Sequence, residues 1–148
     1  MAAGIRALPQ AIIIFLIAAV LGLRLAIGAY PLAVVVALVL LGAAAFATFS
    51  LIVACIVKTR ERFMGIGQLL TMPLFFASNA IYPLELMPPW LRAVARVNPL
   101  TYLVDGLRAT MIHGATSRFG LAIDVVVPAL LLVALIVLAA RLYPGLAR

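Results

Sequence analysis

The sequence predicts an all-α integral membrane protein with four transmembrane helices and a re-entrant or amphipathic helical hairpin on the outer side before the last span. Composition is the first reason: 68% of the 148 residues are hydrophobic and only 10% are charged, against roughly 25% charged residues in soluble domains. The mean hydropathy of the chain is +1.30. Apolar runs of membrane length recur along the chain, so we expect one transmembrane domain over residues 1–148.

Four apolar runs define the predicted spans. A helix rises about 1.5 Å per residue, so about 20 residues cross a hydrocarbon core that is about 30 Å thick. The second run has no charged residue and is longer than this, so it has to tilt or to extend beyond the lipid core. The small residues that follow Gly42 favour close approach of another helix; the alternative is a plain alanine-rich helix in lipid. The spans are expected at residues 11–30, 32–57, 63–82 and 121–140.

The charges at the ends of these runs predict the orientation. Arg6 followed by an apolar run has the appearance of a signal peptide, but no small-residue cleavage motif precedes a soluble domain, so we predict a retained first span. Four spans place both termini on one side. Cations crowd the short segments of that side, which favours cytoplasmic termini. The charged residues of the turn between the second and third spans are Lys58, Arg60, Glu61 and Arg62.

Several function classes are excluded by what the sequence lacks. The net charge is +7, but the basic residues stand at the ends of apolar runs, so we expect a lipid bilayer and no nucleic acid as partner. With a single cysteine and a single histidine, no disulfide and no Cys/His metal site is predicted; Cys55 is expected to pack and His113 to cap or to be solvated. No GxxxxGK[ST], GxSxG or HExxH motif occurs, so we expect neither a cofactor nor catalytic residues in this chain.

The third run contains polar side chains that lipid would penalise. Such groups are expected to face protein or water, and Pro73 is expected to kink the helix. These polar residues are Gln68, Thr71, Ser78 and Asn79.

The connection before the last span, residues 83–120, is longer than two spans require, and long connections often carry function. Its pattern is helical. Pro89 suits a first helical position, and Trp90 lies with apolar residues on one face while Arg92 and Arg96 occupy the other. This predicts a short amphipathic helix at an interface, with Trp90 at headgroup depth.

A second helix is expected directly after the first. Asn98 can cap it, Pro99 fits its first turn, and it should run to about His113. Asp105 and Arg108 stand three apart, close enough to pair. Two interpretations stay open: two surface helices on an external loop, or a helical hairpin that dips back into the outer half of the membrane as a plug.

A family resemblance is carried by residues 73–114, which read PLFFASNAIYPLELMPPWLRAVARVNPLTYLVDGLRATMIHG. They contain a Pro-Leu-Phe-Phe-x-Ser core, Tyr-Pro followed by Leu, a Pro-Pro-Trp-Leu helix start, an Asn-Pro-Leu-Thr-Tyr turn and Asp-Gly-Leu-Arg. In this order between two spans, these elements resemble the signature region of the type-2 ATP-binding-cassette (ABC-2) permeases, especially bacterial exporters of the daunorubicin-resistance kind. The Lys-Thr-Arg-Glu turn at residues 58–61 is similar to the cytoplasmic connection that this family places before the region.

The resemblance implies that the four spans correspond to the last four of the family's usual six. The first two spans are then missing from this chain; we favour a truncated form, the alternatives being a fragment or a second chain that supplies them. The resemblance also implies an ATP-driven exporter of drugs, lipids or glycans in the bacterial cytoplasmic (inner) membrane. Two permease copies would pair, and two copies of a partner ATPase would hold the ATP and magnesium.

The same resemblance suggests roles for the residues singled out above. The polar strip of the third span would line the substrate path, and the 58–62 turn would touch the ATPase. The outer gate would consist of Trp90, Arg92, Arg96, Asp105 and Arg108. Two other functions stay open: a small four-helix proton-coupled drug antiporter, which would depend on Asp124 or Asp105, and a structural membrane subunit without transport activity.

Overall fold

The computed structural model describes residues 2–22, 25–26, 28–57 and 59–142, and in this part of the chain all regular structure is helical. The side chains of residues 2–8, 11, 15 and 60 lie outside that description. The predicted all-α class is confirmed. The helices are α1 Ala2–Val20, α2 Ala29–Ile56, α3 Arg60–Phe76, α4 Pro89–Val97, α5 Pro99–Met111 and α6 Leu121–Leu142.

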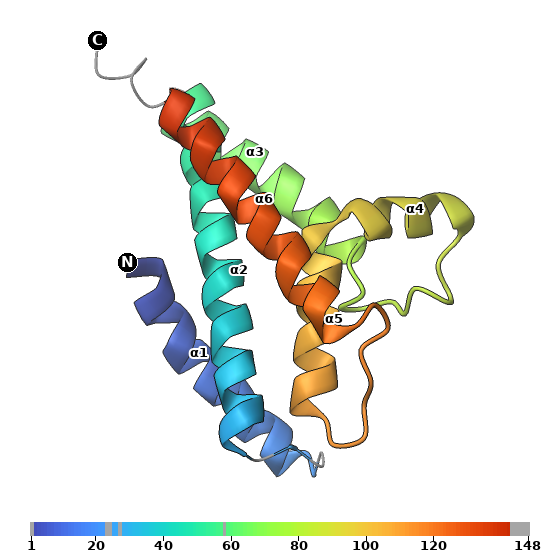
Figure 1. Cartoon of the computed structure of the whole chain (residues 1–148). Coiled ribbons are helices and arrows are strands. Elements are labelled where there is room, and N and C mark those ends of the chain that lie inside the picture. The colour runs from blue at the N-terminus through green and yellow to red at the C-terminus, as the bar shows by residue number, and fades with distance from the viewer. Residues whose placement is uncertain (1, 23–24, 27, 58, 143–148) are drawn as a thin grey trace.

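The helices are arranged around α2 and α6, which pack side by side and run in the same direction (Figure 1). The end of this pair that carries the α1–α2 connection and the 112–120 loop is called the loop end below. α1 packs along α2, and α5 lies against both α2 and α6 near the loop end. α3 runs back from the opposite end, and α4 projects sideways from the other helices (Figure 1).

The first predicted span is wrong in its bounds. α1 ends at Val20, so residues 11–30 do not form one continuous helix. Leu21 and Gly22 turn the chain, and Gly22 has φ +74°, a conformation that glycine adopts without a steric penalty. Beyond the turn, Leu25 forms an isolated antiparallel bridge with Ile112, which joins the α1–α2 connection to the end of α5.

The third predicted span is also wrong in its bounds, because α3 ends at Phe76 and residues 77–82 form turns. The Ser78 hydroxyl donates to the carbonyl of Phe75 (2.6 Å) and accepts the N–H of Ala80 (3.3 Å), which stabilises the turn after the helix. With 17 residues, α3 is about 26 Å long, somewhat less than the hydrocarbon core.

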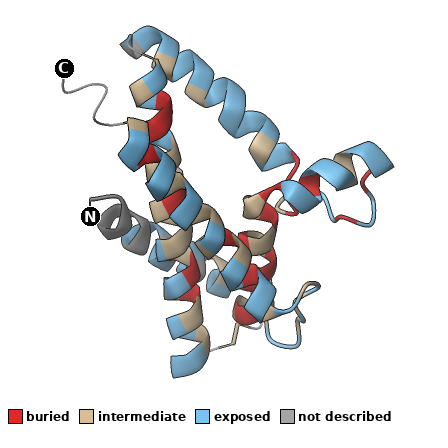
Figure 2. Ribbon diagram, turned by 45° about the horizontal axis from the view of Figure 1, so that its top comes forward, coloured by how far each residue is buried: buried red, intermediate tan, exposed pale blue. Residues whose placement is uncertain are grey.

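Two helices in the described part of the chain, α2 and α6, are long and apolar enough to cross a membrane. Only 22% and 11% of their most apolar stretches are buried, whereas a core helix of a soluble protein would be mostly buried. Exposed residues run along the outer faces of the bundle in Figure 2. The structure therefore shows two membrane-length apolar helices where the sequence predicts four spans.

Two glycines let α5 approach its neighbours closely. A Cβ at Gly106 of α5 would lie 3.0 Å from Asp124 Cβ on α6 and 3.1 Å from Leu38 Cδ1 on α2. A Cβ at Gly42 of α2 would lie 3.1 Å from Leu103 Cδ1 of α5. These distances are shorter than ordinary van der Waals contacts, so glycine at these positions sets how near the three helices lie. The close approach predicted at Gly42 is confirmed, with α5 as the partner.

Candidate functional site

The α4–α5 hairpin turns at Asn98, which is 3% exposed. Its Oδ1 accepts the N–H of Leu100 (3.0 Å), so it caps α5 as the sequence predicts. Its Nδ2 donates to the carbonyl of Leu74 (2.6 Å) near the end of α3. One side chain therefore starts α5 and ties the hairpin corner to α3.

Two further side chains of α5 hold the corner. The Thr101 hydroxyl is buried and donates to the carbonyl of Ala95 (2.7 Å), one of the last carbonyls of α4. The Tyr102 hydroxyl donates to the carbonyl of Arg96 (2.6 Å). Carbonyls at a helix C-terminus lack a partner in a following turn of the helix. The Tyr102 hydroxyl supplies a partner for the Arg96 carbonyl, and the Ala95 carbonyl accepts both the Thr101 hydroxyl and the N–H of Asn98 (3.2 Å). These bonds fix the angle between α4 and α5.

Arg92 does not simply point away from α4 as part of a solvated polar face. Its guanidinium donates to the carbonyls of Leu84 (2.9 Å), Glu85 (3.0 Å) and Met87 (3.1 Å). A planar guanidinium with several donors suits a cluster of converging carbonyls. Arg92 thus fastens the loop before α4 onto the helix, whereas Trp90 and Arg96 are exposed.

The predicted pair of Asp105 and Arg108 is wrong. Asp105 is buried and accepts the N–H groups of Arg118 (2.7 Å) and Phe119 (3.3 Å) from the 112–120 loop. The guanidinium of Arg108 donates instead to the carbonyl of Asn79 (3.0 Å), in the turn that follows α3. The two side chains serve different neighbours because α5 is wedged between α6 and the end of α3.

A second carboxylate lies beside Asp105. Asp124 of α6 is fully buried, and its Oδ2 is 2.6 Å from the Ser117 hydroxyl oxygen. The same hydroxyl oxygen is 3.2 Å from Asp105 Oδ2 and accepts the N–H of Gly120 (2.7 Å). Asp124 Oδ1 is buried without a hydrogen-bond partner among the described residues. The junction of α5, α6 and the loop therefore contains two carboxyl groups that share one serine.

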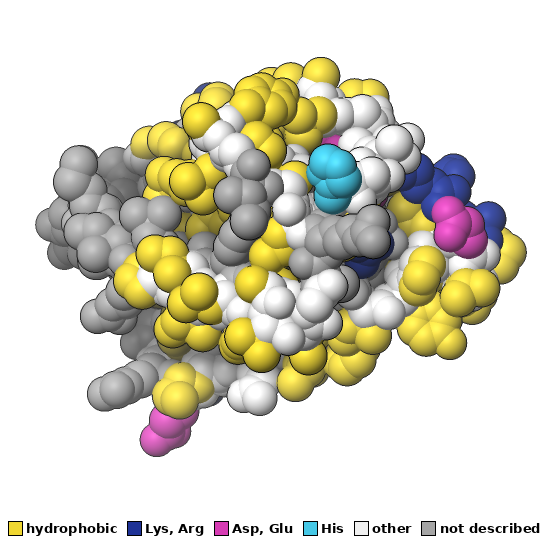
Figure 3. Space-filling view, turned by 90° about the horizontal axis from the view of Figure 1, so that it is seen from below, with side chains coloured by type: hydrophobic (Ala, Val, Ile, Leu, Met, Phe, Trp, Pro, Cys, Tyr) yellow, Lys and Arg dark blue, Asp and Glu magenta, His cyan; other side chains and the backbone are white. Residues whose placement is uncertain are grey.

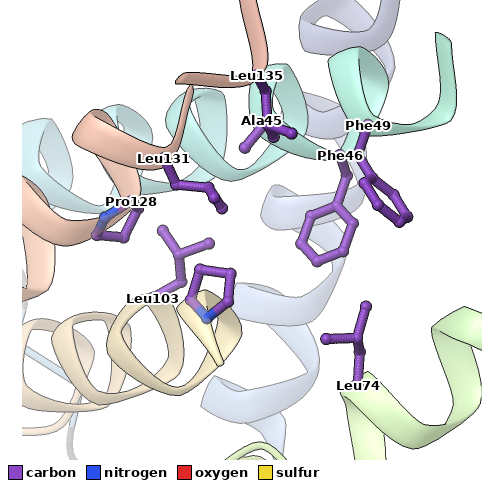
Figure 4. A pocket seen from close by; sticks show the side chains of 9 residues that line it. Ala45, Phe46, Phe49, Leu74, Leu103, Pro128, Leu131 and Leu135 are labelled. Atoms are coloured by element: carbon purple, nitrogen blue, oxygen red, sulfur yellow. The ribbon is translucent and has the colours of Figure 1, made fainter. Parts of the chain in front are cut away.

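An apolar cavity of about 210 Å³ lies at the start of α5. Figure 4 shows side chains of four helices around it: Phe46 and Phe49 from α2, Leu74 from α3, Leu103 from α5 and Leu131 from α6. The nine lining residues are all apolar and supply no polar side chain to orient a ligand. The cavity can accept hydrocarbon groups and has no means of directing polar or catalytic chemistry.

The predicted polar strip of the third span divides into two pairs. Gln68 and Thr71 of α3 are exposed and border an open groove that Ser50 of α2 also lines. The Thr71 hydroxyl donates to the carbonyl of Gly67 (2.7 Å), one helical turn earlier. Ser78 and Asn79 are buried in the turn after α3.

The remaining predicted positions lie away from the hairpin. Glu61 and Arg62 are exposed at the start of α3, Lys58 lies outside the described residues, and of Arg60 the backbone alone is described. Cys55 is partly buried in α2 and His113 is exposed in the 112–120 loop. No group of three or more potential metal ligands occurs in the described part of the chain.

Charged side chains of both signs are visible at the loop end (Figure 3). Figure 3 looks onto this end and shows basic and acidic side chains gathered at one edge of a mostly apolar face. An ion pair between Arg118 and Glu85 joins the 112–120 loop to the loop before α4. Both side chains are partly exposed, 44% and 68%, so this ion pair contributes little stability.

The contacts of three residues escape prediction from the sequence: Thr101 and Tyr102 of the hairpin, and Ser117 of the 112–120 loop. Each bonds a group six to twelve residues away, beyond the three- and four-residue spacings that reveal contacts within a helix. For Thr101 and Tyr102, the one local indication in the sequence is that they are polar residues close to the Asn-Pro corner.

An all-helical chain with two exposed apolar helices of membrane length is typical of an integral membrane protein. Comparison with known families gives the particular class: residues 1–112 match the model of the ABC-2 type transporter family. This region covers more than half of the chain, so the chain belongs to the ABC-2 type transporter family. The resemblance seen in the sequence is confirmed.

Curated relatives are similar over part of their length. Over 68 residues the chain is 35% identical to the putative transport permease ycf38 of Cyanophora paradoxa, covering 46% of this chain and 23% of the relative. It is 32% identical to nodulation protein J of Rhizobium meliloti (strain 1021), over 53% of this chain and 30% of that protein. It is 31% identical to the daunorubicin resistance ABC transporter permease protein DrrB1 of Streptomyces coeruleorubidus, over 56% and 29% respectively.

The aligned region thus spans about a quarter of the length of the first of these relatives. No solved structure matches the chain.

Proposed function

We propose that the chain forms part of the translocation path of an ATP-driven exporter and that its α4–α5 hairpin is the outer gate. The observation that carries the proposal is the position of Pro99, the first residue of α5, which lines the same cavity as Leu131. Leu131 is ten residues into α6, which is about 15 Å along the helix and half of the hydrocarbon core.

This depth favours the re-entrant interpretation of the hairpin over two surface helices. From Pro99, α5 runs back towards the loop end and finishes where Ile112 bridges to Leu25. A helix that starts at mid-membrane depth is tolerated only where protein shields its backbone. Asn98 supplies that shielding, because its Oδ1 accepts the N–H of Leu100 and its carbonyl accepts the N–H of Thr101.

The groove bordered by Gln68 and Thr71 is our proposed substrate path. Its polar side chains lie on α3, a helix with no buried side chain among those described, and its wall on α2 is lined by Ser50. The path would end at the turn with Ser78 and Asn79, where Arg108 of the hairpin donates to the Asn79 carbonyl. The gate residues would thereby contact the end of the path. Drugs, lipids and glycans remain the candidate substrates.

The proposal includes the partners and the location implied by the family. Two ATPase copies carrying ATP and magnesium would bind the cytoplasmic side, where the 58–62 turn would contact them, and a second permease copy would complete the path. The membrane would be the bacterial inner membrane, with both termini in the cytoplasm.

Cysteine accessibility tests the orientation. In a Cys55→Ala background, Arg96→Cys should react with an impermeant maleimide from outside intact cells, and Arg60→Cys only after permeabilisation. The reverse pattern would overturn the proposed orientation, and equal labelling of both would contradict a gate on one side.

The energy source tests the function itself. Cells that express the chain with its partner ATPase should export daunorubicin, the probe suggested by one relative, and a substitution of the P-loop lysine in the ATPase should abolish export. Export that survives this substitution but stops on addition of a proton uncoupler would favour the antiporter, for which the buried pair Asp105 and Asp124 is the specific observation. No export, with no ATPase recovered on purification of the tagged chain, would favour a structural subunit.

A further inference from the structure

Two buried carboxyl groups and one hydroxyl meet where α5, α6 and the 112–120 loop join. Asp105 is 5% exposed and Asp124 is 0% exposed. The oxygen of Ser117 lies within hydrogen-bond distance of one carboxyl oxygen of each, 3.2 Å and 2.6 Å. A serine hydroxyl carries a single hydrogen, so it can donate to one of the two carboxylates only. If both carboxyl groups were ionised, the Ser117 oxygen and the carboxylate oxygen to which it does not donate would face each other without a hydrogen between them.

The backbone identifies which carboxyl group is ionised. Asp105 Oδ2 accepts two backbone N–H groups of the loop, from Arg118 and Phe119. Hydrogen bonds donated to a carboxylate favour its charged form. The Asp124 side chain has one hydrogen-bond partner among the described residues, the Ser117 hydroxyl, and its Oδ1 has none there.

A negative charge on Asp124 would also lack a cation. The facing part of α2 around Leu38 carries no titratable residue between Pro31 and Ala54. On α5, Arg108 donates to the Asn79 carbonyl, and on the loop the guanidinium of Arg118 pairs with Glu85. His113 is exposed in the same loop. Thus no described basic side chain reaches Asp124.

The position of Asp124 in the first turn of α6 favours its charged form, but this effect is smaller than the cost of burying the charge. A carboxylate in the first turn of a helix is stabilised weakly by the helix dipole. Burying a charge without a partner destabilises the folded protein much more. The second effect is larger, so the neutral form of Asp124 is favoured.

We propose that Asp124 binds a proton and that this proton completes a hydrogen-bonded chain from α6 to α5. Asp124 Oδ2–H donates to Ser117 Oγ, whose own hydrogen goes to the ionised Asp105 Oδ2, while Ser117 Oγ also accepts the N–H of Gly120. The proton comes from water, and the site keeps a single negative charge. This hydrogen-bonded chain connects the hairpin to α6, whatever substrate the protein transports.

Infrared spectroscopy of the full chain in lipid nanodiscs at neutral pH tests the proton directly. A neutral carboxylic acid has a carbonyl stretching band that carboxylates lack. The wild-type protein should show this band, Asp124→Asn should lose it, and the matched control Glu85→Gln, at an exposed carboxylate, should keep it. Absence of the band from the wild type, or its persistence in Asp124→Asn, would overturn the proposal.

Stability provides an independent measurement. Asparagine reproduces the shape and the donor of a neutral aspartic acid, so the thermal midpoint of Asp124→Asn should stay at the wild-type value. Ser117→Ala removes the central hydroxyl and should lower the midpoint by several degrees. A fall in Asp124→Asn as large as in Ser117→Ala would show that Asp124 is needed as a charge and would overturn the proposal.

Arg24 stands between α1 and α2 in the sequence and lies outside the described residues, so its effect on Asp124 is tested by substitution. Under our proposal, Arg24→Gln leaves the infrared band unchanged. A band that appears only in Arg24→Gln would mean that Arg24 compensates an ionised Asp124, and the proposal would fail.

Discussion

Helices α3 and α5 are both built mainly from apolar residues, with a few charged and polar ones, but they have opposite surroundings. α5 buries Thr101, Leu103, Asp105, Gly106 and Thr110 against its neighbours. None of the described side chains of α3 is buried, and Figure 2 shows the helix as almost entirely exposed. Apolar composition therefore does not decide whether a helix of this chain is packed; the presence of complementary groups elsewhere in the chain does.

The difference extends to how polar groups are satisfied. Thr101 and Asp105 of α5 bond groups on α4 and on the 112–120 loop, whereas Thr71 of α3 bonds only the carbonyl of the preceding turn of its own helix. In a membrane the exposed surface of α3 requires a lipid or protein partner from outside the described chain. We infer that α5 belongs to a core formed within the chain, and that α3 presents a surface.

The largest effect should come from filling the space beside α5. Gly106→Val places a side chain against Asp124 Cβ and Leu38 Cδ1, and overpacking of this kind costs about 1–3 kcal/mol. The matched control is Gly65→Val in α3, where a Cβ would have no neighbour within 4 Å. Both variants carry the same cost of a β-branched residue in a helix, so their difference isolates the packing of α5. Thermal unfolding in detergent micelles measures the difference between the two midpoints. Equal midpoints would contradict the inference that α5 is packed and α3 is not.

The second-largest effect is expected at Asn98, which starts α5 and bonds the hairpin to α3. Asn98→Ala removes both the cap of α5 and the bond to the Leu74 carbonyl, and loss of a cap alone costs about 0.5–2 kcal/mol. Asn98→Asp keeps the acceptor for the Leu100 N–H but not the donor to Leu74. We expect Asn98→Ala to lower the midpoint of unfolding and Asn98→Asp to free α3 from the hairpin, seen as faster hydrogen exchange near Phe76. Unchanged exchange in Asn98→Asp would mean that α3 is held by other contacts.

The hairpin was predictable from the sequence to the extent that its signals are local. Pro89, Asn98 and Pro99 mark helix starts by their own backbone chemistry, and the bounds of α4 and α5 follow them closely. The partner of Asp105 is a loop N–H thirteen residues further on, which no helical spacing indicates. The end of α3 was missed because residues 77–82 are apolar enough for lipid but turn at Ser78, whose hydroxyl replaces helical hydrogen bonds.

A smaller effect is expected at Arg92, which belongs to the hairpin but not to its junction with α5. Arg92→Lys keeps the charge but cannot donate in the same planar geometry to the carbonyls of Leu84, Glu85 and Met87. A loss of about 1 kcal/mol is expected, the typical net value of a hydrogen bond, with faster protease cleavage of the loop before α4. Arg96→Lys, at an exposed position of the same helix, is the control and should not change cleavage. Faster cleavage in both variants would mean that the bonds from the Arg92 guanidinium to the three carbonyls are not what holds the loop.

The smallest effect should come from the ion pair between Arg118 and Glu85, which joins two loops at the surface. Exposed pairs contribute about 0–1 kcal/mol, because water screens the charges and both side chains lose rotamer freedom. Glu85→Gln should therefore change the unfolding midpoint by less than Gly106→Val, Asn98→Ala or Arg92→Lys. The double exchange Glu85→Arg with Arg118→Glu should restore whatever is lost. A large loss in Glu85→Gln would mean that this pair holds the 112–120 loop in place, so that the packing of α5 would depend on surface charge as well as on its buried contacts. The buried contacts of α5 alone would then not be enough to keep the helix packed.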